Sequence, residues 1–177
     1  MPTFIAFLRA VNVGKRQYPM AELRDALTAA GFEKVETHIQ TGNVVFRTSM
    51  RSRQKVIAAL EKAMLEDRGF AVPVVVMTPQ ELSEVYEEAC DFGGDKLLQG
   101  HYLTLLAQPP TEEGAKALEA RSEPGAEVRV GERAVHLMLN KPYNEVTTSN
   151  AEVERHLGVA TTRNLTVITK LTEKWGS

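Results

Sequence analysis

The segment Val35-Glu36-Thr37-His38-Ile39-Gln40-Thr41-Gly42-Asn43-Val44-Val45-Phe46 decides the fold of the N-terminal half. Its first six residues alternate with a period of two, which is typical of a strand with one buried face. Gly42-Asn43 suits a tight turn, because glycine accepts a positive φ, and the apolar run Val44 to Phe46 returns as the second arm. The segment therefore predicts a β-hairpin.

Helical patterns flank this hairpin on both sides. Before it, Met20 to Ala30 carries apolar residues on one face and follows Pro19, which suits the first turn of a helix. After it, Ser52 to Arg68 shows a second apolar face, and the apolar strands Thr3 to Leu8 and Val72 to Met77 enclose the set. The order β-α-β-β-α-β is that of ferredoxin-like folds, in which both helices cover one face of an antiparallel sheet.

The C-terminal half partly repeats this order. Thr78 to Glu81 forms a capping box that begins a third helix, and Asp91 to Asp95 interrupts the pattern. The strands and helices expected beyond it are Tyr102–Ala107, Thr111–Arg121, Glu127–Val130, Ala134–Leu139, a helix after Ser149, and a final helix Thr162–Trp175. We expect an α+β protein in which a ferredoxin-like subdomain, residues 1–92, packs on a second, smaller α+β subdomain, residues 93–177, that ends in a long helix.

Composition excludes several classes of protein. The 177 residues are 43% hydrophobic and 25% charged, which excludes intrinsic disorder and allows a real core. No apolar run approaches the roughly 18 residues of a membrane span, and the first residues lack the basic region of a signal peptide. The single cysteine, Cys90, cannot form an internal disulfide. We therefore expect a cytoplasmic protein without a membrane partner.

Charge is uneven along the chain. Residues 1–60 carry nine basic and four acidic residues, residues 61–132 carry six and fifteen, and residues 133–177 carry six and four. The two basic ends could form an anion-binding face. The alternative is a solvated surface with no role beyond solubility.

Known catalytic motifs are absent from the sequence. There is no G-x-S-x-G, no H-E-x-x-H and no complete P-loop around Gly14. The four histidines have no metal-ligand spacing, so packing or surface roles are expected for His38, His101, His136 and His156. Cys90 has no visible activating partner, and the acidic residues of the third helix, Glu81 to Asp91, are expected on a solvated face. We name no catalytic residue, no cofactor and no metal site.

Three polar segments are the candidate binding site, because they lie at a strand end, a hairpin and a helix start, where backbone amides are free. The first two could cradle an anion and read its hydrogen bonds, and the third could cap the last helix while its arginine faces outward. Ordinary turns and simple capping are the alternative explanation. The candidates are Arg9, Asn12, Gly14, Lys15, Gln40, Asn43, Thr161, Thr162, Arg163 and Asn164. Of these we expect Arg9, Asn12, Gln40, Asn43, Thr162 and Arg163 to line one cleft.

The same segments carry a family resemblance. Leu8 to Gly14, Met20 to Arg24, Gln40 to Phe46 and Ala160 to Asn164 resemble the signatures of the domain of unknown function 1697 family, which consists mostly of bacterial proteins. Lys15 stands where such proteins often have a second glycine, and Leu165 where a tryptophan is expected after Arg-Asn. The resemblance implies an α+β fold with a ferredoxin-like half, and it implies no activity.

Three functions remain open. The favoured one is a small protein that binds an anionic ligand, such as a nucleotide, a phosphorylated metabolite or a nucleic-acid backbone. The nucleic-acid version has basic ends in its favour, but the aromatic strand of an RNA-recognition motif is absent. The second is an enzyme acting on a phosphorylated or carboxylated metabolite, which a buried acid or histidine beside the site would favour. The third is a structural or oligomerising protein without a ligand, for which the hairpin edge at Val44 to Phe46 would be the contact. The sequence does not fix its oligomeric state.

Overall fold

The computed structural model describes residues 1–94 and 96–176 as two compact units. The first unit is Met1–Pro79, and the second runs from Gln80 onward. The third helix is thus counted with the second unit, which is the longer of the two. Among the helices of the described residues, none is long and apolar enough to cross a bilayer.

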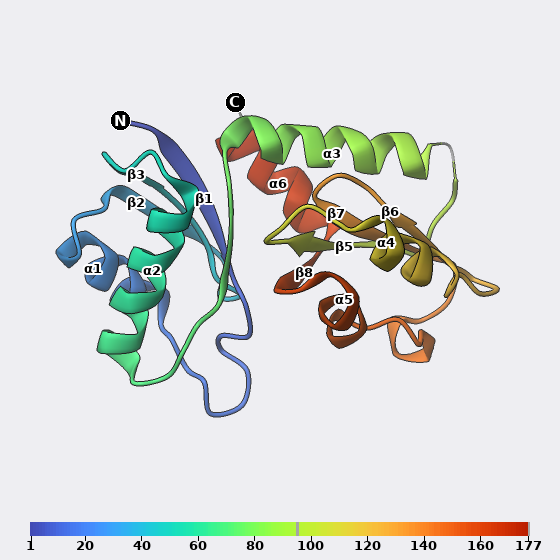
Figure 1. Ribbon diagram of the computed structural model, residues 1–177, viewed down its shortest axis with the longest axis horizontal. Helices are drawn as coiled ribbons and strands as arrows, with labels where there is room; N and C mark the ends of the chain where they lie inside the picture. Colours follow the sequence, from blue (N-terminus) through green and yellow to red (C-terminus); the bar gives the residue numbers. More distant parts are fainter. Residues whose placement is uncertain (95, 177) are drawn as a thin grey trace. The chain divides into compact units, whose positions relative to one another are not determined.

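The first unit has the ferredoxin-like arrangement that the sequence predicts (Figure 1). Its four strands pair in the order β2-β3-β1-β4, and every pairing is antiparallel. The β3 strand is therefore interior, flanked by β2 and β1. Its elements are β1 (Thr3–Leu8), α1 (Met20–Ala29), β2 (Glu33–His38), β3 (Asn43–Arg47), α2 (Arg53–Arg68) and β4 (Val74–Met77).

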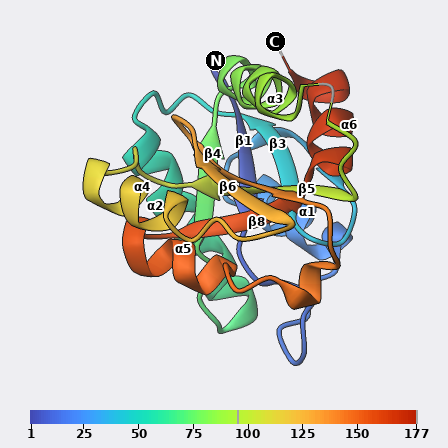
Figure 2. The ribbon, with the colours of Figure 1, turned by 90° about the vertical axis from the view of Figure 1, so that its right-hand side faces the viewer.

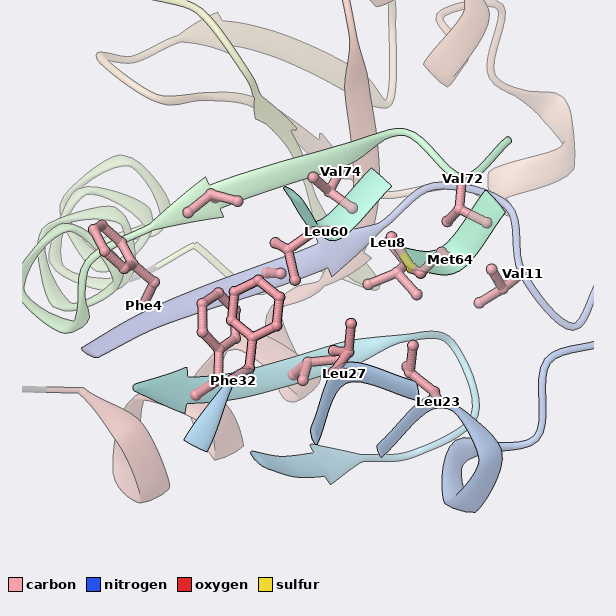
Figure 3. Packing of buried hydrophobic residues seen from close by; sticks show 14 of the residues in the cluster. Phe4, Leu8, Val11, Leu23, Leu27, Phe32, Leu60, Met64, Val72 and Val74 are labelled. Atoms are coloured by element: carbon pink, nitrogen blue, oxygen red, sulfur yellow. The ribbon is translucent and has the colours of Figure 1, made fainter. Parts of the chain in front are cut away.

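Both helices of the first unit cover the same face of its sheet, as predicted. Leu23 and Leu27 of α1 share one hydrophobic cluster with Leu60 and Met64 of α2 (Figure 3). The strand residues of this cluster alternate along each strand, so they lie on one face; they are Phe4, Ala6, Leu8, Val44, Phe46, Val74 and Val76. Burying each large apolar side chain contributes about 1.5–3 kcal/mol, so this shared cluster holds the unit together.

The second unit repeats the same topology. Its strands pair in the order β6-β7-β5-β8, again antiparallel throughout. A short 3₁₀ helix, η1 (Tyr143–Glu145), precedes α5. The other elements are α3 (Pro79–Gly93), β5 (Gly100–Leu106), α4 (Glu112–Glu119), β6 (Ala126–Val130), β7 (Ala134–Leu139), α5 (Asn150–Leu157), β8 (Ala160–Asn164) and α6 (Leu165–Trp175).

The strand β8 corrects the sequence interpretation, which began the final helix at Thr162. Thr161 and Thr162 lie in β8 and pair with β5, consistent with the preference of β-branched residues for strands. The cap of α6 is Asn164, whose Oδ1 accepts from the Val167 amide at 2.8 Å. A polar side chain does cap the last helix, as predicted, but the cap is Asn164 and the helix begins at Leu165.

Helices cover both faces of the second sheet. Leu118 of α4 and Val153 of α5 share a cluster with residues of one face, whereas Glu88 of α3 contacts His136 on the other. On that second side α3 and α6 are neighbours whose axes cross at an angle, with α3 seen nearly end-on in the second view (Figure 1 and Figure 2). Ser83 near the start of α3 is close to the end of α6, and the last turn of α3 lies near the beginning of α6.

Candidate functional site

The loop after β1 is braced by its own side chains. Asn12, at φ +57°, accepts from the Tyr18 amide at 2.8 Å and donates to the carbonyls of Tyr18 (3.0 Å) and Gln40 (2.6 Å). Arg16 donates to the carbonyls of Ala10 and Ala71. These two polar side chains are therefore occupied by backbone, while Gly14 and Lys15 lie exposed at the loop tip and Arg9 is half-buried.

The β2–β3 turn is fastened to the same loop. The Gly42 carbonyl accepts from the Leu8 amide at 2.8 Å, and a Cβ on Gly42 would lie 2.7 Å from the Leu8 Cβ. Asn43 is fully buried and donates to the His38 carbonyl at 2.9 Å. The structure thus brings the first two predicted segments together, through Asn12 and Gln40. Thr161 to Asn164 belong to the second unit, and a cleft shared by all three segments stays a prediction.

Arg163 does not face outward as the sequence suggested. It lies in β8 opposite Leu103, is 7% exposed, and donates to the Thr161 hydroxyl at 2.8 Å and the Thr162 carbonyl at 2.9 Å. Burial lowers the pKa of the Arg163 guanidinium to about 10, so it stays charged at neutral pH. The Thr162 hydroxyl is also engaged, by Asn150 and Thr104.

A pocket of about 590 Å³ opens within the second unit, beside the start of α6. Its volume is in the usual range for small-molecule sites. Of the predicted site residues it includes Asn164 alone. Its lining residues come from the end of α3, the loop before β5, the start of β5 and the first turns of α6: Ala89, Cys90, Gly93, Gly94, Lys96, Leu98, Gln99, Gly100, His101, Tyr102, Asn164, Leu165, Thr166 and Thr169.

The described lining of the pocket holds one charged side chain, a lysine that pairs with Glu127. Lys96 is the only charged side chain there, and no carboxylate is among the lining residues that the structure describes. Lys96 donates to Glu127 at 3.0 Å and to the Phe92 carbonyl at 3.2 Å, which leaves one of its three N–H groups. The amides of Leu165 and Thr166 precede the first hydrogen bonds inside α6 and have no intrahelical acceptor.

A chain of three polar side chains leads into this pocket. His101 Nε2 lies 3.1 Å from His136 Nδ1, and His136 Nε2 lies 2.8 Å from Glu88 Oε1. His136 is fully buried and packs edge-on against Phe92, with ring centroids 4.9 Å apart. His101 is 7% exposed and lines the pocket. These three groups are linked in series and do not converge; among the described residues no cluster of His, Cys, Asp or Glu could hold a metal ion.

Gly131 makes room for the carboxylate of this chain. Any Cβ at position 131 would collide with the Glu88 carboxylate, which lies against the backbone there. The Glu132 amide donates to Glu88 Oε2 at 3.3 Å and helps to hold it. Glu88 is thus positioned by the β6–β7 turn, and it is not on the solvated face that the sequence suggested.

Burial sets the protonation of His101. Desolvation, with His136 and Lys96 nearby, lowers the pKa of His101 to about 4. The ring is therefore neutral at physiological pH and cannot itself supply a positive charge to a ligand.

Sequence reasoning missed both histidines of the chain because their contact depends on strand register. His136 on β7 is opposite Leu103 on β5, so His101, two residues earlier, is its diagonal neighbour on the same face. Residues 35 apart in sequence gave no spacing signal. The one available signal was an apolar strand interrupted by a histidine in each case.

Comparison with known proteins identifies related chains without assigning chemistry. A family model described as "Protein of unknown function (DUF1697)" matches residues 1–136. The conserved bacterial protein SP0830 from Streptococcus pneumoniae has a similar structure, with a TM-score of 0.79 and 22% sequence identity. The similarity covers 100% of this chain and 99% of that one, and at this identity it shows the fold alone. No curated protein matches the sequence.

Proposed function

The chain belongs to the DUF1697 family of proteins of unknown function, and from the geometry of its second unit we propose that it binds an anionic small molecule in the pocket beside α6. The observation that carries the proposal is the lining of this pocket. It combines Lys96 with the free amides at the start of α6 and, among the residues described, no carboxylate. Buried His101 is a further polar side chain in the lining, which a ligand in the pocket would contact.

The helix start is suited to an anion for a physical reason. The first amides of a helix carry partial positive charge and point out of its N-terminal end, roughly along the axis. Lys96 adds a full charge, and its contact with Glu127 holds it in place. A phosphate or carboxylate in the pocket would therefore meet charge-assisted hydrogen bonds from both sources.

The proposal is tested by calorimetric titration of the purified protein with inorganic pyrophosphate. Lys96→Gln and Asn164→Asp are each expected to weaken binding roughly tenfold or more, since hydrogen bonds to charged groups are worth about 1.5–3 kcal/mol. Aspartate caps a helix as well as asparagine does, so Asn164→Asp adds a negative charge without removing the cap. Binding should also weaken as salt rises.

Two variants serve as matched controls. Lys116→Gln removes a lysine from α4, where its side chain is 75% exposed and paired with Glu112. Ser149→Asp makes the equivalent cap change at α5. Neither residue lines the pocket, so both should bind pyrophosphate as the unchanged protein does. Equal losses in test and control variants would contradict the proposal.

The single cysteine offers an independent readout. Cys90 lines the pocket and is exposed. Saturating pyrophosphate should therefore slow its alkylation by iodoacetamide, measured by mass spectrometry. A ligand that binds elsewhere would leave this rate unchanged.

A cytoplasmic location remains part of the proposal, supported by the lone cysteine.

The alternatives are affected differently by the geometry. The hypothesis of an enzyme gains support, because buried His101 lines the same pocket as Asn164. The oligomer hypothesis assumed a free strand edge at Val44 to Phe46. These residues lie in β3, an interior strand that has no free edge.

A further inference from the structure

Nδ1 of His101 is a polar atom of a buried lining residue that has no hydrogen-bond partner among the described residues. His101 is 93% buried, since 7% of it is exposed, and its Nε2 is occupied by His136. Within the described part of the chain, Nδ1 has no hydrogen-bond partner, and solvent can reach this atom. It faces Gly93, where a Cβ would lie 3.7 Å away. An exposed edge of an otherwise buried ring is thus turned toward the pocket.

The direction of the hydrogen bonds fixes what this atom can do. An ionised carboxylate only accepts, so His136 Nε2 must donate to Glu88. In the tautomer in which His136 Nδ1 carries the lone pair, it accepts from His101 Nε2 across the 3.1 Å contact. The remaining nitrogen of His101 has no hydrogen. Glu88, at the other end of this chain of three side chains, thereby makes Nδ1 an acceptor.

We propose that His101 Nδ1 accepts a hydrogen bond from a hydroxyl group of the bound anion, so that the pocket selects phosphorylated or carboxylated compounds that carry a free hydroxyl over their deoxy counterparts. This inference rests on the proposed function, which supplies the anionic end of the ligand. His101 is the specificity-determining residue, and His136 and Glu88 are positioning residues that set its tautomer.

The groups around His101 favour a neutral acceptor over a cation. His136 from β7 and Lys96 from the loop before β5 both disfavour a proton on the ring, and burial does so most strongly. Glu88 acts on it through His136. A cationic ring would attract any anion, whereas a neutral ring with a fixed lone pair discriminates by whether the ligand has a donor.

The two recognition points are close enough for one small ligand. Asn164, the cap of α6, is opposite Tyr102 in the β5–β8 register, and Tyr102 directly follows His101. Opposite residues of antiparallel strands have Cα atoms about 4.5–5.5 Å apart. The side chains of His101 and Tyr102 lie on opposite faces of β5, but His101 and the start of α6 line the same pocket of about 590 Å³, so one small ligand in it would meet both.

The test compares two phosphate monoesters of equal chain length, glycerol 3-phosphate and n-propyl phosphate, by calorimetry at pH 8. Glycerol 3-phosphate is expected to bind about tenfold more tightly, because the compound without hydroxyls leaves the buried acceptor unpaired. His101→Phe should remove this preference while keeping affinity for n-propyl phosphate. Glu88→Gln should reduce the preference, because an amide can donate as well as accept and no longer fixes the tautomer.

A measurement on the unchanged protein keeps the test independent of any folding defect in the variants. Ring ¹⁵N shifts of His101 at pH 8 should show hydrogen on Nε2 and none on Nδ1. The opposite tautomer, or equal binding of the two monoesters, overturns the inference and leaves anion binding intact. Retained preference in His101→Phe also overturns it. If neither monoester nor pyrophosphate binds, the proposed function fails and the inference fails with it.

Discussion

His101 Nε2 and His136 Nδ1 lie 3.1 Å apart, so the rings on β5 and β7 share a single hydrogen between them. Neither nitrogen can change its protonation without affecting the other, because one must donate and the other accept. Glu88 at the far end of this pair imposes a direction on it. The chain therefore behaves as one unit, and the following predictions test its parts and the fold that holds it.

The stability of the protein should depend on pH through His101. The folded pKa of about 4 is below the ordinary value near 6.5, so the unfolded chain binds more protons between these values. The contribution of His101 is fully present above about pH 6.5 and is lost as the pH falls toward 4, on the order of 3 kcal/mol. Denaturant unfolding at several pH values, compared with His101→Phe, should show this difference. Identical slopes for the two proteins would contradict it.

Gly131→Ala should disconnect Glu88 without removing it. The new methyl group would occupy the place of the carboxylate, whose flexible side chain can move away, so global stability should change little. The ring ¹⁵N shifts of His136 should move as they do in Glu88→Ala. In the Glu88→Ala background the glycine change should have no further effect on those shifts, as expected for two changes that remove one interaction. Additive effects would show that the glycine acts elsewhere.

Arg163→Ala should destabilise the second unit. It removes a buried side chain and leaves the Thr161 hydroxyl and the Thr162 carbonyl without this donor. We expect a loss of about 2 kcal/mol or more in the free energy of unfolding. Arg155→Ala is the control, because that side chain is 73% exposed and should change stability by less than about 0.5 kcal/mol. A stable Arg163→Ala protein with weakened pyrophosphate binding would favour the original ligand-binding assignment.

Asn12→Ala should loosen the loop after β1 and leave pyrophosphate binding unchanged. Three hydrogen bonds are lost, and alanine is less suited than asparagine to φ +57°, so a cost of about 2 kcal/mol or more is expected in thermal unfolding. Asn12→Gly relieves the backbone and isolates the hydrogen-bond contribution. Gln17→Ala, whose side chain has one exposed contact with Gly14, serves as the control.

The topology of the first unit was accessible from sequence because its signals are local. Alternation before Gly42, the proline before α1 and the apolar faces of two helices each act over a few residues. The β8 strand was missed because Thr161 and Thr162 precede a true helix cap at Asn164, and hydroxyl residues before a helix suggest a cap of their own. Its strand character comes from pairing with β5, a contact made across the chain.

The candidate site was predicted only in part for the same reason. Asn164 was identified by its place at a helix start, and it does line the pocket. Arg163 was read as outward-facing, but the pleat of β8 turns it to a buried side. Glu88 looked like one of several acids on a helix, and what distinguishes it is the absence of a side chain at Gly131, a residue 43 positions later.

The repeated topology determines which elements form the walls of this pocket. In each half of the chain the fourth strand runs into a helix, β4 into α3 and β8 into α6. The pocket is walled by the last turn of the first of these helices and the opening turns of the second. A single β-α-β-β-α-β-α set would have only one such helix and therefore only one side of the pocket. The cavity therefore depends on two helices that follow strands of different sheets, and neither helix alone would form it.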